Sequence, residues 1–290
     1  MNQKELELEE TESPVAFPNV VRAYVGANIF TLDWQATSDS QRAGSTWTSA
    51  GATQNPLYLT FADPVLGAAV NLYHTLVHLG SKDADGKARE SDVISAVWSD
   101  FTDRDVRRID GTQLRYWHGG SATAVNTRQL LAHANGQCGS WAHLFIDTLR
   151  GQGITGPRKI LVFSSDEPLD PATGLPVTPW NTSMLVKRWT FAGAGSSPAT
   201  APYTYTIADL TDEEGVPGQG NANPPSAFGN HFLVVLDGKY YDPSYGTGPF
   251  SSENEWENAS LDGFGRDFGF IGYRYKKNDP TVLETVFIQV

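Results

Sequence analysis

The single cysteine of the chain, Cys138, stands at the start of a segment with helical character. The first-turn N–H groups and the dipole of a helix stabilise negative charge, so a cysteine placed there forms the nucleophilic thiolate readily. A lone cysteine is about equally often a small buried apolar residue. The position of Cys138 therefore indicates thiol chemistry if other residues of the chain supply a base.

A second segment offers that base together with a residue to orient it. His231 begins an apolar, strand-like run, Asp237-Gly238 is a strong signal for a tight turn, and Asp242 follows on the returning strand. An aspartate that accepts from one imidazole nitrogen leaves the other to take the thiol proton and later to protonate a leaving group. Cys138, His231 and Asp242 are thus a candidate nucleophile, base and orienting residue for acyl transfer.

The sequence around these residues resembles the transglutaminase-like superfamily, which has a papain-like core. Gly136-Gln137-Cys138 followed by Trp141 resembles the active-site motif, and His231 followed by Tyr241-Asp242-Pro243-Ser244 resembles the histidine and aspartate motifs, in the same order. The resemblance covers roughly residues 90 to 275. It implies an α+β catalytic core with a Cys-His-Asp triad, and we expect no cofactor.

Two departures limit what the resemblance implies. Animal cross-linking enzymes have Trp directly after the cysteine, where this chain has Gly139, and the 93 positions from Cys138 to His231 exceed the spacing of small members. A shared fold does not select one activity. We therefore expect hydrolysis of a peptide or amide bond in a protein or peptide substrate, in preference to transamidation. The alternative is a catalytically inactive module of this fold that binds a protein or glycan partner.

The chain also resembles papain-like proteases, but less well. In those enzymes the reactive cysteine directly precedes the tryptophan, and here Ser140 occupies that position. Their orienting residue is typically an asparagine ahead of a Ser-Trp pair, whereas this chain offers Asp242-Pro243-Ser244. The transglutaminase-like alignment is the better of the two.

An acyl-transfer site also needs hydrogen-bond donors for the oxyanion that develops on the substrate. The backbone N–H of Cys138 is one candidate; the side chain of Gln137, which is equally a candidate turn residue, and Trp117, by family analogy, are others. The Gly- and Pro-rich segment 215–229 leads into His231, and it either rims the site or is an ordinary surface insertion. Candidate substrate contacts there are Gly218, Gln219 and Asn230.

Other histidines are alternatives as base or as metal ligands. His143 lies five residues beyond Cys138 and would face away from it on a helix, while His133 stays open as a base. His74 and His78 are four apart in a segment that reads at least as well as a strand. No carboxylate or cysteine cluster completes a zinc site with them, so no metal is predicted.

Composition excludes several classes of partner. The 21 basic and 33 acidic residues give a net charge of −12, which argues against binding to nucleic acid or to anionic membrane surfaces. No apolar run is long enough to cross a bilayer, and the N-terminus lacks a basic region followed by an apolar core, so neither membrane insertion nor a signal peptide is predicted. Localisation stays open.

The order of the predicted elements gives an α+β fold in three parts. Residues 1–14 are acidic and predicted to be disordered, residues 15–85 form a β-rich N-terminal element, and residues 86–290 form the catalytic domain. In that domain a helix over 90–101 precedes strands that we expect to form an antiparallel sheet. The predicted strands are 20–25, 29–32, 56–61, 159–163, 184–189, 231–236 and 239–241.

Overall fold

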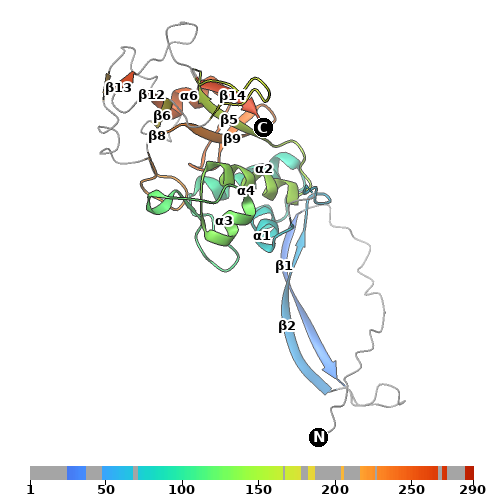
Figure 1. The fold of residues 1–290 in the computed structure, drawn as a ribbon. Coiled ribbons are helices and arrows are strands. Elements are labelled where there is room, and N and C mark those ends of the chain that lie inside the picture. The colour runs from blue at the N-terminus through green and yellow to red at the C-terminus, as the bar shows by residue number, and fades with distance from the viewer. Residues whose placement is uncertain are drawn as a thin grey trace.

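The computed structural model describes residues 25–36, 48–67, 71–165, 167–177, 182–186, 204–205, 216–225, 227–266, 270–272 and 285–290. Within these ranges helices combine with antiparallel sheets, so the predicted mixed α+β class is confirmed. Figure 1 shows a long hairpin at one end, a group of helices in the middle and the strands of two sheets beyond the helices. The predicted acidic tail 1–14 and most of the predicted strand 20–25 lie outside the described residues.

The hairpin consists of β1 (Gly26–Ala36) and β2 (Thr48–Leu59), which pair antiparallel and project away from the helices (Figure 1). Its register places Leu32, Trp34 and Leu57 on one face, with 37%, 51% and 41% of each residue exposed. A two-stranded sheet is only marginally stable by itself in water. The hairpin, which supplies the described strands of the predicted N-terminal element 15–85, is an extended arm that joins the helices at its root (Figure 1).

Four helices cover one face of the sheet that follows. Helix α4 is central, since α1, α2 and α3 all contact it and since its buried side chains, among them Trp141 and Phe145, lie in the larger hydrophobic core. The helices are α1 (His74–Lys82), α2 (Glu90–Thr102), α3 (Thr127–His133) and α4 (Cys138–Gly151). The prediction of a helix over 90–101 is confirmed by α2.

Helix α1 decides between the two structures that the sequence left open for its segment. The residues around His74 and His78 suited a strand at least as well as a helix, and they form a helix. Leu76 and Leu79, three positions apart, are both fully or almost fully buried, and α1 packs on α4. Tertiary burial of one helical stripe thus outweighs the strand-like composition of the segment.

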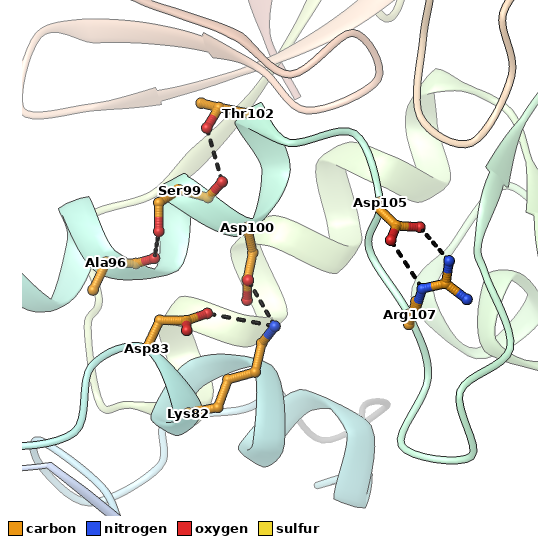
Figure 2. A network of polar contacts seen from close by, with 8 residues as sticks. All are labelled: Lys82, Asp83, Ala96, Ser99, Asp100, Thr102, Asp105 and Arg107. Carbon is orange, nitrogen blue, oxygen red and sulfur yellow. Dashed lines mark hydrogen bonds and ion pairs between the residues drawn. The ribbon is translucent and has the colours of Figure 1, made fainter.

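Helices α1 and α2 are joined by a polar cluster that Figure 2 shows at close range. The ammonium group of Lys82 lies 2.7 Å from Oδ1 of Asp100 and 3.4 Å from Oδ2 of Asp83. Burial, and the hydrogen bond that protonated Asp100 donates to Asp83, raise the pKa of Asp100 to about 7, against the opposing effect of Lys82. Asp100 therefore keeps its proton at weakly acidic pH.

A five-stranded antiparallel sheet lies against the helices, in the order β11-β10-β9-β5-β14. Side chains alternate across it: Val234 and Leu236 enter the core with the helices, whereas Leu233 enters a second core on the opposite face. The strands are β5 (Arg158–Ser164), β9 (Asn230–Leu236), β10 (Lys239–Asp242), β11 (Thr247–Phe250) and β14 (Thr285–Gln289). The predicted strands 159–163, 231–236 and 239–241 are confirmed.

A second five-stranded sheet has the order β7-β13-β12-β6-β8, and helix α6 (Glu253–Ser260) leads into its strand β12. The second core joins the two sheets and contains Ile160 and Val162, Met184 and Leu261, and Trp256 of α6. The strands are β6 (Thr182–Val186), β7 (Thr204–Tyr205), β8 (Ala227–Phe228), β12 (Leu261–Arg266) and β13 (Phe270–Gly272). The predicted strand 184–189 overlaps β6, and its last three residues lie outside the described ranges.

Candidate active site

Cys138 is the first residue of α4, as predicted, and 6% of it is exposed. Strand β4 (Asn135–Gly136), which pairs in parallel with β3 (Arg115–Tyr116), ends just before this helix begins. The N–H groups of Ser140 and Trp141 both donate to the carbonyl of Gln137. Among the described residues this leaves the N–H groups of Cys138 and Gly139 without a backbone acceptor, as is usual for a helix start.

His231 lies on β9 and Asp242 on β10, and both residues are fully buried. Asp237 and Gly238 have φ angles of 52° and 73°, which is the tight turn expected of this pair. The register of β9 and β10 pairs Tyr241 with Val234, so Asp242 reaches the face that carries His231. Nε2 of His231 lies 2.8 Å from Oδ2 of Asp242.

The environment of His231 favours the charged imidazolium. Burial by itself lowers the pKa, but the charge and hydrogen bond of Asp242, and a contact with the Cys138 thiol, raise the pKa of His231 to about 10. Because Nε2 is taken by Asp242, the nitrogen left for the thiol is Nδ1, which has no hydrogen-bond partner of good geometry among the described residues. The structure thus brings all three predicted catalytic residues together.

Three aromatic residues that the sequence did not single out hold this pair in place. The imidazole stacks on Phe228 at 5.0 Å between ring centroids and lies nearly parallel to Trp256 at 6.1 Å. Trp256 Nε1 also donates to Oδ2 of Asp242 at 3.3 Å. Tyr245 approaches the imidazole at 5.7 Å. Rings on several sides fix the orientation of the imidazole and exclude water from the His231–Asp242 pair.

Two buried tyrosines complete the surroundings of the thiol. Tyr116 and Tyr245 pack edge to face at 5.2 Å, and burial, followed by nearby negative charges that include Cys138, raises the pKa of both well above its ordinary value. Both phenols therefore stay neutral at physiological pH. Neither residue was predicted to be part of the site; one lies on β3 and the other just after the Asp242 turn.

The predicted oxyanion donors occupy different surroundings. The side-chain Nε2 of Gln137 donates to the carbonyl of Ala122 at 2.8 Å. Trp117 has a left-handed backbone with φ of 48°, its carbonyl accepts from Asn221, and its ring packs on the larger core. An oxyanion role for either side chain stays a prediction, whereas the N–H of Cys138 has the helix-start position that such a role requires.

The predicted substrate contacts split into buried and accessible residues. A β-carbon on Gly218 would lie 2.8 Å from the Tyr116 ring, and fully buried Gln219 donates to the carbonyls of Phe101 and Pro243. Gln219 therefore supports the turn that carries Asp242, and Gly218 leaves room for the Tyr116 ring. Asn230 is the partly buried first residue of β9.

The alternative bases lie elsewhere. His133 is exposed at the last residue of α3. Nε2 of His143 is 3.2 Å from Nζ of Lys159, and burial, with the charges of Lys159 and Arg150, lowers the pKa of His143 to about 4. His231 is therefore the histidine that contacts the thiol.

His74 and His78 both contact the hydroxyl of Tyr58, at 3.0 Å and 3.2 Å. Within the described ranges, no group of three or more His, Cys, Asp and Glu side chains is arranged to hold a metal ion. No helix in the same ranges is both long and apolar enough to span a bilayer.

Comparison of the chain with protein-family models, with curated proteins and with solved structures gives no match. The chemistry of the site therefore has to be argued from its own geometry.

Proposed function

We propose that the chain is a cysteine-dependent acyl-transfer enzyme that acts on peptide or amide bonds and has a transglutaminase-like core. The observation that carries this proposal is the position of His231, buried between the Asp242 carboxylate and the Cys138 thiol. A nucleophile, a base and a group that orients the base are the minimum set for this chemistry. The order of the three motifs along the chain supports the family assignment.

The first step follows from the charge of the histidine. With its pKa raised, His231 is an imidazolium at neutral pH, and a cation beside a cysteine favours the thiolate. The thiolate attacks the carbonyl carbon of the substrate, and the carbonyl oxygen becomes an oxyanion. The N–H groups of Cys138 and Gly139 at the start of α4 are placed to donate to it.

The second step uses the proton on Nδ1 of His231. The tetrahedral intermediate collapses, the C–N bond breaks, and the imidazolium protonates the leaving amine, so that a thioester with Cys138 remains. Water then attacks the thioester and gives one proton to the neutral His231. The C–S bond breaks, which releases the carboxylic acid and restores the Cys138 thiolate beside the His231 imidazolium. An amine in place of water would give transamidation; we favour hydrolysis because no acceptor site for an amine is identifiable in the sequence.

The test is turnover of a fluorogenic peptide library by the full chain and by Cys138→Ala. We expect hydrolysis in the starting protein, no hydrolysis in the variant, and an increase in intact mass that corresponds to one acyl group on Cys138 under rapid quench. Equal turnover by both proteins would contradict the proposal, because no other cysteine is present.

A binding module without turnover is the second candidate, and the projecting hairpin favours it. Its exposed face of Leu32, Trp34 and Leu57 is an apolar surface on an otherwise acidic chain. This candidate predicts a thiol that reacts slowly and independently of His231. The alkylation experiment that closes the Discussion separates it from the enzyme.

A further inference from the structure

Lys159 places a positive charge close to the candidate nucleophile. It lies on β5, opposite Val234 of β9, and its ammonium group is 4.6 Å from the centroid of the Phe232 ring. Its other close contact is Nε2 of His143, at 3.2 Å. Lys159 is partly buried, so its charge is only partly screened by water.

That charge is not balanced by a carboxylate in the described part of the protein. None of the ion pairs among the described residues includes Lys159. His143 is neutral at physiological pH because its pKa is lowered, so it does not compensate the charge either. A partly buried cation without a counter-ion is costly for folding, and such groups are concentrated at ligand sites.

Lys159 is connected to the candidate site through Phe232. Phe232, under the ammonium group, follows His231 in the chain, and a β-carbon on Gly139 would lie 3.4 Å from the Phe232 ring. Gly139 follows Cys138. Burial lowers the pKa of Lys159, and the charge of Cys138 offsets part of that effect. The ring of Phe232 is thus the common neighbour of the ammonium group and of the first turn of α4.

We propose that Lys159 binds an anionic group, a carboxylate, on the acyl part of the substrate that Cys138 attacks. This inference rests on the proposed acyl-transfer function and names the class of its substrate. The imidazolium of His231 lies against the Asp242 carboxylate, at 2.8 Å, whereas the ammonium group of Lys159 has no carboxylate partner in the described part of the chain. Lys159 is therefore the cation beside the site that is left to attract an anionic group of a ligand.

The test compares two reagents of nearly the same size on the full chain. Iodoacetate and iodoacetamide both alkylate a thiolate: the sulfur forms a bond to the CH₂ carbon, the C–I bond breaks, and iodide leaves with the bonding electrons. Only iodoacetate carries a carboxylate. We expect the ratio of the iodoacetate rate to the iodoacetamide rate at Cys138 to be about fivefold lower in Lys159→Met than in the starting protein. In that variant, raising the salt concentration should lower the ratio by less than about twofold.

Two further variants sharpen the result. Lys159→Arg keeps the charge and is expected to keep the ratio, while Lys87→Met, a change at an exposed lysine, leaves it unchanged. Circular dichroism checks that each variant is folded. The retained ratio in Lys159→Arg distinguishes a loss of charge from a loss of packing on Phe232.

The failures of the two proposals are distinguishable. If Lys159→Met slows both reagents equally and leaves the ratio unchanged, the lysine acts only on the thiolate, and the substrate inference is overturned while the acyl-transfer proposal stands. If both reagents react slowly with the starting protein and His231→Ala has no effect, the acyl-transfer proposal and the inference that rests on it are both overturned.

Discussion

A β-carbon on Gly136 would lie 2.1 Å from Oγ of Ser140, and that hydroxyl donates to the carbonyl of Gln137 at 2.7 Å. The hydroxyl is thus fixed on the first turn of α4, directly over β4. The glycine lets the strand pass beneath the helix that begins at Cys138. The position of the thiol therefore depends on the absence of a side chain at Gly136.

We predict that Gly136→Ala lowers the free energy of unfolding by about 1–3 kcal/mol, because the new methyl group has to displace Ser140 or Leu130. Denaturation in urea measures it. The matched control is Gly67→Ala, where nothing lies within 4 Å of the added carbon, and we expect a change within about 0.5 kcal/mol. In a Ser140→Ala background the loss should shrink; an equal loss in both backgrounds would speak against the clash.

Gln219 supports the second half of the site. Its Nε2 donates to the carbonyls of Phe101 and Pro243 at 2.7 Å and 2.9 Å, which ties the loop 216–225 to α2 and to the Asp242 turn. We predict that Gln219→Glu, which directs a carboxylate at two carbonyl oxygens, lowers the free energy of unfolding by about 2–4 kcal/mol.

The same amide-to-acid change at an exposed position is the control for Gln219→Glu. Asn223 is exposed in that same loop, and Asn223→Asp should change stability by less than about 0.5 kcal/mol. Thermal and urea denaturation of both variants decide the matter, and similar losses in the two would refute the role given to Gln219.

The sequence allowed the pairing of His231 with Asp242 to be predicted because the interaction is local. A strong turn signal at Asp237-Gly238 lies between two apolar runs, so the register follows from a few neighbouring residues. The cysteine at a helix start was recognisable for the same reason. Both depend on short-range chemistry that the sequence displays directly.

Contacts between distant segments could not be predicted. Trp256 reaches Asp242 from α6, and Lys159 approaches Cys138 only because β5 pairs with β9, more than seventy positions later in the chain. The role of Gln219 was misjudged in the same way, because a Gly- and Pro-rich loop is usually at the surface, whereas this amide is buried. The choice between helix and strand for residues 74–82 stayed open for the same reason, because the burial of α1 against α4 is not visible in local composition.

The raised pKa of His231 predicts a loss of stability at alkaline pH. The folded protein holds this proton up to about pH 10, whereas the unfolded chain releases it near the ordinary value of 6.5. The stabilising contribution is therefore fully present below pH 6.5 and declines as the pH rises toward 10. The difference in unfolding free energy between the starting protein and His231→Gln should decrease over that interval, and a constant difference would contradict the pKa shift.

Asp100 predicts a loss of stability in a different pH range. Its side chain is 11% exposed, and its pKa is raised to about 7 from an ordinary value of 3.8. The folded state thus favours the protonated carboxyl, and this contribution, complete below pH 3.8, is lost as the pH rises to 7. In Asp100→Asn the side chain at position 100 is uncharged at every pH. The starting protein should therefore lose stability relative to this variant as the pH rises from 3.8 to 7.

The exposed Asp103→Asn, just after α2, is the control for the amide substitution at Asp100. Urea denaturation at several pH values measures all three proteins. A difference between the starting protein and Asp100→Asn that grows in favour of the starting protein from pH 4 to 7 would show that the pair with Lys82, rather than burial, dominates.

The most direct test of the central claim is the pH dependence of iodoacetamide alkylation at Cys138, in the starting protein and in His231→Ala. The label is unambiguous because the chain has one cysteine. We predict rapid alkylation already near pH 6, and in His231→Ala a rate at least about tenfold lower there, with the pH dependence of a free thiol of pKa about 8.5. Slow alkylation that is the same in both proteins would contradict a paired, catalytic cysteine.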